Sequence, residues 1–124
     1  MCDMIHRFLT SMALLVSVGA ASAQLATTNG TGVTVRALDK LTGQVSDLEI
    51  GNAQSKTVGR ISIQINECRY PDGNAAGEAY ASLTITEVGV DGPVFQGWMI
   101  ASSPALNAMD HQRYDVWVLR CTTS

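Results

Sequence analysis

The sequence is poor in charge, and the charge it has is dispersed. It carries 8 lysine and arginine residues against 11 aspartate and glutamate residues, a formal net charge of −3 at pH 7. It contains no basic run, whereas binding to nucleic acid or to an anionic membrane surface needs clustered lysine and arginine. Nucleic acid and membrane surfaces are therefore poor candidate partners.

Long hydrophobic runs are also missing. The apolar run 8–18 is shorter than the roughly 18 to 20 residues that a spanning helix needs. It follows a short basic segment and leads into small residues that end with Ala-Ser-Ala at 21–23, an order typical of a cleaved export signal. We predict a signal peptide at 1–23, starting at Met1 or Met4, and no stable membrane span after its cleavage. The expected location is periplasmic or secreted.

Cysteine is scarce, and one of the three cysteines, Cys2, lies in the predicted signal. Cys68 and Cys121 remain as an even pair in an exported chain, which favours a disulfide between them. A metal site built on these two residues would lack convincing further ligands. The bridge would close a loop of roughly 54 residues and stabilise the fold by about 4 kcal/mol in the chain-entropy model.

Motifs of catalytic and metal-binding proteins are missing as well. The sequence has no G-x-S-x-G, no H-x-H and no H-x-x-x-H, and no pair of carboxylates stands out for glycoside hydrolysis. Ser102, Ser103, Asp110 and His111 supply the residue types of a Ser-His-Asp triad, but without its usual setting. His111 with Asp110 and Asp115 is an equally weak metal set. We predict no catalytic residue, no metal and no cofactor.

The pattern that is present is the alternation of apolar and polar residues in short segments, separated by glycine, proline, aspartate and asparagine. It predicts strands at 33–38, 44–50, 57–67, 78–88, 95–101 and 113–121. Ser103 followed by Pro104 suits a helix start, so one or two helical turns are expected at 104–109. The predicted fold is all-β: a single antiparallel β-sandwich or small barrel of about six strands at 33–124, after a flexible lead-in at 24–32.

Both cysteines bear on which faces of the strands are buried. The alternation of isoleucines at 61–65 would place Cys68 on the polar face, so we expect a β-bulge near 66–67 that turns it inward. In the last strand Trp117 has the same parity as Cys121. This parity predicts that Trp117 packs beside the disulfide in the core.

The remaining unusual residues gather between Val94 and Cys121. We select Trp98, Asp110, His111 and Tyr114 as candidate binding residues, because loops on a rigid scaffold often carry function. If the strand face that carries Trp98 is exposed, Trp98 and Tyr114, joined by Tyr80, would form an aromatic patch suited to a sugar ring or a partner protein.

The segment G-W-M-I-A-S-S-P-A-L-N-A-M-D-H-Q-R-Y-D-V-W-V-L-R-C at 97–121, A-L-D-K-L-T-G at 37–43 and the intervening Cys68 together resemble a known family. It is domain of unknown function 2155, a family of small exported alphaproteobacterial proteins. The resemblance covers essentially the whole chain after the predicted signal. It implies an envelope or secreted location and transfers no catalytic or binding residue.

The expected function is that of a non-enzymatic periplasmic β-domain. It would bind or help organise an envelope component, protein or glycan, through the segment from Trp98 to Tyr114. The alternative is a carbohydrate-binding module or a small hydrolase of cell-wall glycan. A purely structural subunit of an envelope complex is a third interpretation.

Overall fold

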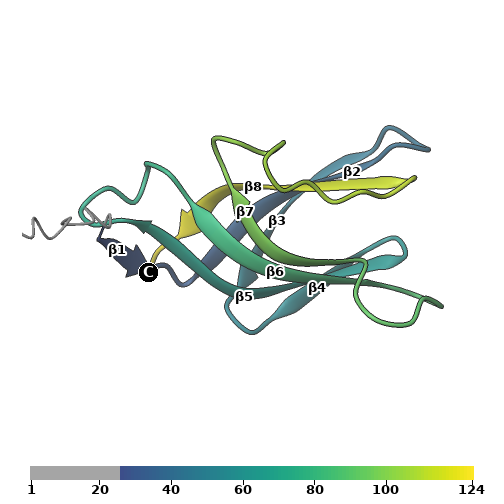
Figure 1. Ribbon diagram of the computed structural model, residues 1–124, viewed down its shortest axis with the longest axis horizontal. Coiled ribbons are helices and arrows are strands. Elements are labelled where there is room, and N and C mark those ends of the chain that lie inside the picture. Colours follow the sequence, from purple (N-terminus) through teal and green to yellow (C-terminus); the bar gives the residue numbers. More distant parts are fainter. Residues whose placement is uncertain (1–25) are drawn as a thin grey trace, which may run out of the picture.

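The computed structural model describes residues 26–124, and within this range the chain forms eight strands and no helix (Figure 1). The strands are β1 (Thr27–Asn29), β2 (Gly32–Asp39), β3 (Val45–Gly51), β4 (Ser55–Val58), β5 (Ile61–Pro71), β6 (Tyr80–Glu87), β7 (Phe95–Ile100) and β8 (Tyr114–Thr122). No helix long and apolar enough to cross a membrane occurs in the described range. The all-β prediction is confirmed, and the predicted signal peptide lies outside the described residues.

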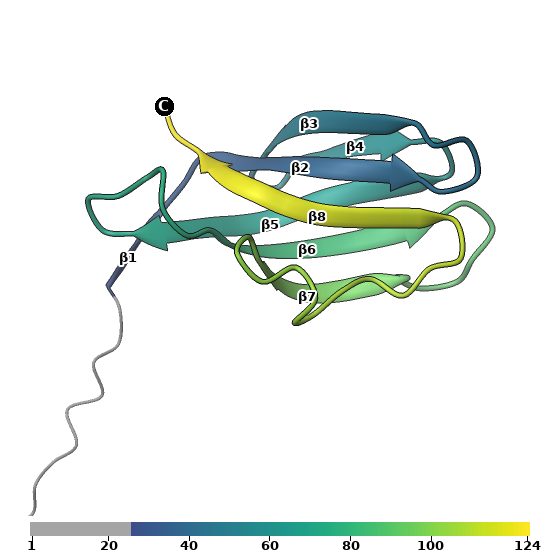
Figure 2. The same cartoon turned by 90° about the horizontal axis from the view of Figure 1, so that it is seen from above.

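The strands form two antiparallel sheets that pack as a sandwich (Figure 2). In the first sheet β5, β6 and β7 lie side by side, and β4 and β1 pair with the first and last parts of β5. The second sheet has the order β3-β2-β8. Consequently β7 and β8 are edge strands, and so are β3, β4 and β1.

The core lies between the sheets and consists of small and branched aliphatic side chains. Alternate residues of each strand point inward, as in β6, where every second residue from Ala81 to Ile85 is fully buried. Other buried members are Val33, Val35, Ile50, Ile61, Ile63, Ile65, Tyr114, Val116 and Val118. Neither tryptophan belongs to this core, because Trp98 and Trp117 point to the outer faces of the two sheets.

The range 57–67, predicted to be one strand, contains the end of β4, a turn and the start of β5, which form a hairpin. Gly59 adopts φ +57 and, with Arg60, turns the chain between β4 and β5. A Cβ at Gly59 would stand 2.4 Å from the hydroxyl of the buried Tyr114, so only glycine fits here. The isoleucine alternation extended the predicted strand across this turn.

The range expected to be a flexible lead-in contains a short strand. Residues Thr27–Asn29 pair with the end of β5 at Arg69–Pro71. Their sequence, T-T-N, carries no apolar alternation, so the strand depends on its partner. Beyond it, Gly30 donates its N–H to the carbonyl of Cys68 (2.7 Å), and Thr31 donates to the carbonyl of Thr122 (2.8 Å).

The predicted helical turns at 104–109 do not form. The segment makes isolated turns instead: Ser103 donates its N–H to Ile100 (3.1 Å), and Leu106 donates to Ser103 (3.0 Å). A helix this short gains too few intrahelical bonds to offset the cost of nucleation. The Asn107 side chain is also engaged elsewhere, because its Nδ2 donates to the carbonyl of Trp98 at 2.8 Å.

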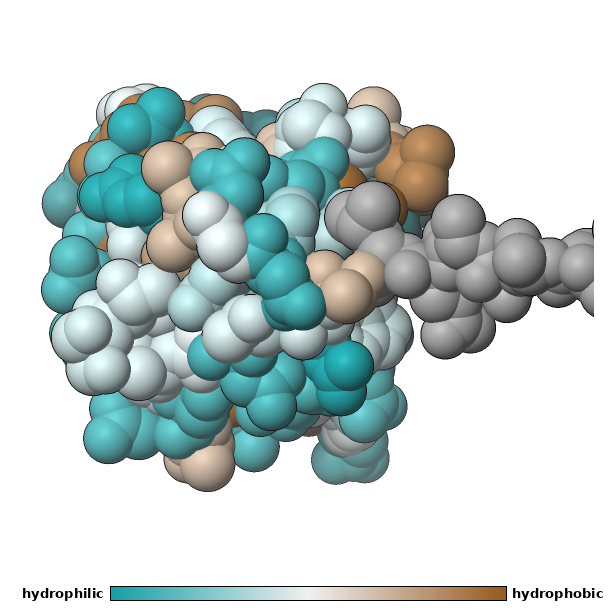
Figure 3. All heavy atoms as spheres, turned by 90° about the vertical axis from the view of Figure 1, so that its left-hand side faces the viewer, coloured by the Kyte–Doolittle hydropathy of each residue, from teal (hydrophilic) through white to brown (hydrophobic). Residues whose placement is uncertain are grey.

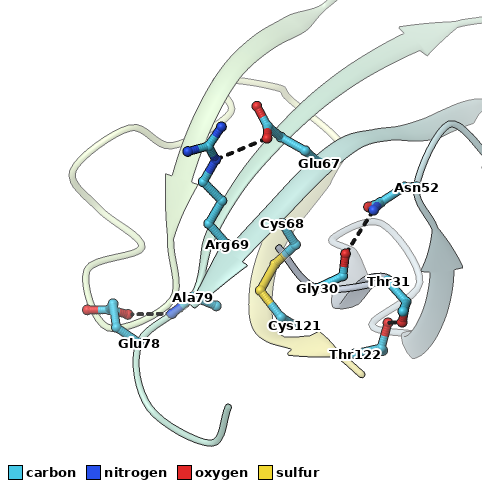
Figure 4. The surroundings of a disulfide bond; sticks show 10 residues. All are labelled: Gly30, Thr31, Asn52, Glu67, Cys68, Arg69, Glu78, Ala79, Cys121 and Thr122. Atoms are coloured by element: carbon cyan, nitrogen blue, oxygen red, sulfur yellow. Dashed lines mark hydrogen bonds and ion pairs between the residues drawn. A yellow bond between two sulfur atoms is a disulfide. The ribbon is translucent and has the colours of Figure 1, made fainter. Parts of the chain in front are cut away.

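The predicted disulfide is present, and the bulge expected before Cys68 is confirmed. The bridge joins β5 to β8, and hence one sheet to the other, with 5.7 Å between the Cα atoms (Figure 4). The pairing of β5 with β6 shifts between Ile65 and Glu67, leaving Asn66 as the extra residue. Cys68 is thereby turned inward and fully buried.

A second bulge corrects the prediction for Trp117. The pairing of β2 with β8 shifts between Thr34 and Val35, so that Leu119 is the extra residue in β8. The parity changes at this point, and the buried residues before it are Val116 and Val118, whereas Cys121 is buried after it. Trp117 is therefore half-buried on the outer face, and its predicted place in the core beside the disulfide is wrong.

The end of the sandwich that carries β1 and the 72–79 loop shows mostly hydrophilic residues, with a few scattered apolar ones (Figure 3). The opposite end carries the turns after β2, β4 and β6 and the start of β8. Most of the predicted site residues lie near this second end or on the connection that leads to it.

Candidate functional site

His111 and Tyr114 are brought together where the chain enters β8. Their ring centroids are 5.4 Å apart. His111 Nδ1 accepts the backbone N–H groups of Arg113 (3.0 Å) and Tyr114 (3.1 Å). The ring proton therefore sits on Nε2, which lies 2.7 Å from the carboxylate of Glu87 at the end of β6. Both ring nitrogens thus serve to hold the start of β8 against β6.

Tyr114 ties the two sheets together. Its side chain is fully buried, and its hydroxyl accepts the backbone N–H of Arg60 in the β4–β5 turn at 3.0 Å. Because the ring is inside the core, Tyr114 cannot belong to an exposed aromatic patch with Trp98. Its role in this fold is to position other residues.

Asp39 and Arg113 form a two-pronged ion pair that was not predicted from the sequence. Arg113 donates from Nε and from a terminal nitrogen to the two carboxylate oxygens, at 3.1 and 2.9 Å. The hydrogen bonds from Arg113 are the main cause that lowers the pKa of Asp39 to about 2. The guanidinium also lies 5.1 Å from the ring centroid of Tyr114. The pair joins the end of β2 to the start of β8.

These residues form a polar cluster, which we define as Asp39, Arg60, Glu87, His111 and Arg113. It links the ends of strands from both sheets, and Lys40 extends it by donating from Nζ to the carbonyl of His111 at 2.7 Å. A groove of about 440 Å³ opens beside it between the β2–β3 and β4–β5 hairpins. The side chains of the cluster bond to one another and to backbone groups, so the cluster stabilises this end of the sandwich.

Trp98 lies at the centre of β7 with 43% of its surface exposed. It pairs with Ser82 of β6 and shares the outer face of the sheet with polar residues. Asn66, on the same face, donates from Nδ2 to the hydroxyls of Ser82 and Thr84, both at 3.2 Å. Tyr80 is a diagonal neighbour of Trp98 on this face and is half-buried.

Asp110 is exposed on the connection between β7 and β8, whereas the preceding Met109 is buried. No side-chain hydrogen bond of Asp110 occurs among residues 26–124. Its carboxylate therefore faces solvent, and the neighbouring Met109 fixes where it stands. Asp110 and His111 are adjacent in sequence but differ in environment. Asp110 is exposed to solvent, whereas both ring nitrogens of His111 are hydrogen-bonded.

The residues of the triad alternative are distributed over opposite ends of β6. Ser102 donates its backbone N–H (2.9 Å) and its hydroxyl to Glu78, just before β6 begins. The hydrogen bond from the Ser102 hydroxyl is the main cause that lowers the pKa of Glu78. His111 bonds to Glu87, where β6 ends. This separation excludes a hydrogen bond between Ser102 and His111.

The weak metal alternative finds no support from the described residues. Across residues 26–124, no three or more His, Cys, Asp or Glu side chains group so as to hold a metal ion. Asp115 lies instead 3.9 Å from Lys40 Nζ, and His111 has both ring nitrogens engaged.

The β7–β8 connection, residues 101–113, is therefore held at three points. Glu78 holds its start through Ser102, Asn107 attaches its middle to β7, and Glu87 holds its end through His111. Leu106 nevertheless remains 74% exposed, next to the residue that contacts Trp98.

Two shallow hollows lie between this connection and β8. One, of about 310 Å³, is lined mainly by apolar side chains, including Ala105, Ala108 and Trp117. The other, of about 300 Å³, includes Ala101 and Leu119. The surface around the connection is thus apolar and structured.

Sequence reasoning located the segment but not the contacts within it. Leu106 and the acceptors Glu78 and Glu87 were missed. Leu106 carried a signal, since an apolar residue in a turn segment free of strand or helix periodicity has no buried face to occupy. No sequence signal marked Glu78 and Glu87 as hydrogen-bond acceptors, because their partners are remote in sequence.

Over residues 33–121 the sequence matches the family described as "Uncharacterized protein conserved in bacteria (DUF2155)". It is 29% identical over 96 residues to the "Uncharacterized protein RP359" of Rickettsia prowazekii (strain Madrid E). That alignment covers 75% of this chain and 62% of the relative, so the chain spans less than two thirds of the relative's length. No solved structure matches the sequence.

Proposed function

We propose that this chain, which belongs to the DUF2155 family of bacterial proteins, is a non-enzymatic binding domain of the cell envelope. The binding surface is the β7–β8 connection together with Trp98. The observation that carries the proposal is a connection tied down at three points that still exposes Leu106 and Trp98. A loop ordered before binding loses little further entropy on contact with a partner.

The exported location rests on two features. The N-terminal residues have the order of an export signal, and Cys68 and Cys121 form a disulfide that links the two sheets. Disulfides persist in oxidising compartments and are rare in the cytosol. Fractionation of cells that produce the full chain, followed by alkylation of free thiols, tests the location. A cytosolic protein with reactive Cys68 would contradict it.

The residues of the predicted site divide into two roles. Trp98 and Asp110 are exposed and can contact a partner, and Leu106 joins them. His111 and Tyr114 act through others, because their polar atoms hold the connection and the sheets in place. This division explains how unusual residues gather in one segment without forming a catalytic set.

Capture from detergent extracts of the cell envelope tests the proposal. The double variant Trp98→Ala, Leu106→Ser should lose partners that the wild-type domain retains. The matched control is Leu41→Ser, Val88→Ser, which removes two exposed apolar side chains, 75% and 62% exposed, from the β2–β3 and β6–β7 turns, outside the proposed binding surface. Equal partner profiles for the two double variants, both folded, would contradict the proposal.

A carbohydrate-binding role is the second candidate, favoured by the setting of Trp98. An exposed indole on the outer face of the sheet, near hydroxyl and amide groups, offers an apolar platform with hydrogen-bonding neighbours. Binding to a glycan array and to purified peptidoglycan would reveal it. Here Trp98→Ala alone should abolish binding, whereas Leu106→Ser should leave it intact. Release of soluble sugars from peptidoglycan would instead indicate a hydrolase.

A further inference from the structure

The groove of about 440 Å³ opens between the β2–β3 and β4–β5 hairpins, whose turns lie at the same end of the sandwich (Figure 1). It exceeds the two hollows at the β7–β8 connection, of about 310 and 300 Å³. Its volume lies in the range of small-molecule sites, roughly 300 to 1,000 Å³. Because β4 and β7 lie at opposite edges of the first sheet, the groove is remote from Trp98. It shares only Arg113 with the proposed binding surface.

The walls of the groove are held in place from both sheets. The Tyr114 hydroxyl accepts the N–H of Arg60 in the β4–β5 turn at 3.0 Å. Asp39 donates its N–H to the carbonyl of Gln44 at 2.9 Å, which closes the β2–β3 hairpin, and its carboxylate pairs with Arg113. A site whose walls are already ordered loses little further entropy when a ligand binds.

The lining of the groove carries no net charge. Asp39 and Arg113 are the only charged residues that line it, and their side chains neutralise each other. The Asp39 carboxylate also accepts the N–H of Leu41 at 3.0 Å, so both of its oxygens are engaged. A charged ligand would find no unpaired countercharge in the lining. The groove therefore favours a neutral ligand.

The remaining hydrogen-bonding groups of the lining are hydroxyls and an amide. Gln44, Ser46 and Thr57 line the groove, and within residues 26–124 their side-chain groups make no hydrogen bond. The second terminal nitrogen of Arg113 is likewise without a partner in this range, because Asp39 accepts only from Nε and the other terminal nitrogen. These groups offer both donors and acceptors to a ligand.

Apolar groups complete the lining. Gln44, Ser46 and Leu48 are alternate residues in and just before β3, so their side chains form a row on one face that is about 14 Å long. Leu48 and Val58 are half-buried and supply apolar contact from opposite walls. A saccharide matches this lining, because it combines neutral hydroxyl groups with apolar C–H groups on its rings.

We propose that the groove between the β2–β3 and β4–β5 hairpins binds a neutral saccharide. Ring C–H groups contact Leu48 and Val58, and ring hydroxyls bond to the side chains of Gln44, Ser46 and Thr57. This site goes beyond the proposed binding surface and does not depend on it. It also differs from the carbohydrate role considered for Trp98, which lies on the outer face of β7.

Isothermal titration with neutral sugars tests the site directly. The probes are maltose, N,N′-diacetylchitobiose and the tetrasaccharides of the same units. At least one should bind saturably to the wild-type protein. Its affinity should change by less than about twofold between roughly 0.05 and 0.5 M NaCl, because a neutral ligand has no charge to screen. Tighter binding of a tetrasaccharide would support a segment of a glycan chain as the ligand, and equal affinities would support a free sugar.

Matched variants identify the place of binding. The double variant Gln44→Ala, Thr57→Ala removes two hydrogen-bonding groups from exposed positions and should weaken binding by about tenfold or more. The control Gln96→Ala, Thr86→Ala makes the same changes at exposed positions of β7 and β6 and should leave the affinity unchanged. In two-dimensional NMR spectra, the amides of Gln44 and Ser46 should shift as the sugar is added.

Three results would overturn the inference. The first is no saturable binding of any of the four sugars, and the second is an affinity that falls steeply with salt, which would indicate a charged ligand. The third is full binding by a folded Gln44→Ala, Thr57→Ala variant. If Trp98→Ala abolished that binding, the sugar would belong to the outer face of β7 instead of the groove.

Discussion

Removing the disulfide should cost the fold about 4 kcal/mol. Cys68 and Cys121 are separated by 53 residues, and in the chain-entropy model a loop of this length constrains the unfolded chain by roughly that amount. The native arrangement should survive, because Gly30 bonds to the carbonyl of Cys68 and Thr31 bonds to that of Thr122 independently of the sulfur atoms. The expected effect is thus on the unfolded state.

Urea unfolding of the double variant Cys68→Ala, Cys121→Ala measures this. With a slope of about 2 kcal/mol per molar urea, typical of a small domain, the midpoint should fall by about 2 M. Wild type unfolded in reductant is the control, since it keeps both side chains and loses only the bond. It should show most of the same decrease. A difference below about 1 kcal/mol in both samples would refute the reasoning.

Three further predictions concern the packing of Tyr114 and the ion pair of Asp39. Tyr114→Phe should lower the free energy of unfolding by about 1 kcal/mol in urea melts, because the partly buried N–H of Arg60 loses its acceptor, whereas Tyr80→Phe should have little effect. Gly59→Ala should destabilise more than Gly43→Ala. Both residues have positive φ, but only a Cβ at Gly59 would clash, and thermal melts of the two variants should rank them accordingly. The pKa of Asp39 lies at about 2, below its ordinary 3.8, so its stabilisation is present above about pH 4 and is lost as pH falls toward 2. In acid titrations followed by circular dichroism, the stability deficit of Asp39→Asn relative to wild type should therefore shrink over that interval, and a constant deficit would contradict the assignment.

Much of the fold follows from local pattern. The alternation of apolar residues placed the β2–β3 hairpin, β6 and β7, and the cysteine count predicted the bridge. The parity conflict at Cys68 even located a bulge, which the shift at Asn66 confirms. The family resemblance is confirmed over residues 33–121. These features share one property. Each is encoded by the local pattern of a strand or by cysteine, which in an exported chain has few roles other than disulfide formation.

Some errors arise where the structure depends on a partner remote in sequence, and others where one local signal outweighed another. The strand β1 has no apolar pattern and exists through its pairing with β5. Trp117 was placed in the core because it lies an even number of residues before Cys121, but the bulge at Leu119 falls between them. The alternating valines Val116 and Val118 indicated the opposite assignment, with Trp117 on the outer face. Gly59 offered a turn signal that the isoleucine alternation outweighed.

The candidate site was predictable as a segment but not as a set of contacts. The bonds of His111 to Glu87 and of Arg113 to Asp39 span long stretches of sequence. No spacing rule reaches across such distances, because the sandwich topology alone brings these groups together. Burial of Tyr114 could have been inferred, since it shares the parity of Val116 and Val118.

The two bulges give the disulfide a further consequence for the register of the strands. Each cysteine points into the core because an extra residue precedes it in its own strand, Asn66 in β5 and Leu119 in β8. A sheet assembled without its bulge would turn that cysteine toward solvent and keep the two sulfurs apart. The bridge and the bulged register therefore stabilise each other in the folded state. Once the disulfide has formed, a pairing of β5 or β8 without its bulge is disfavoured, because it would have to move one sulfur away from the other.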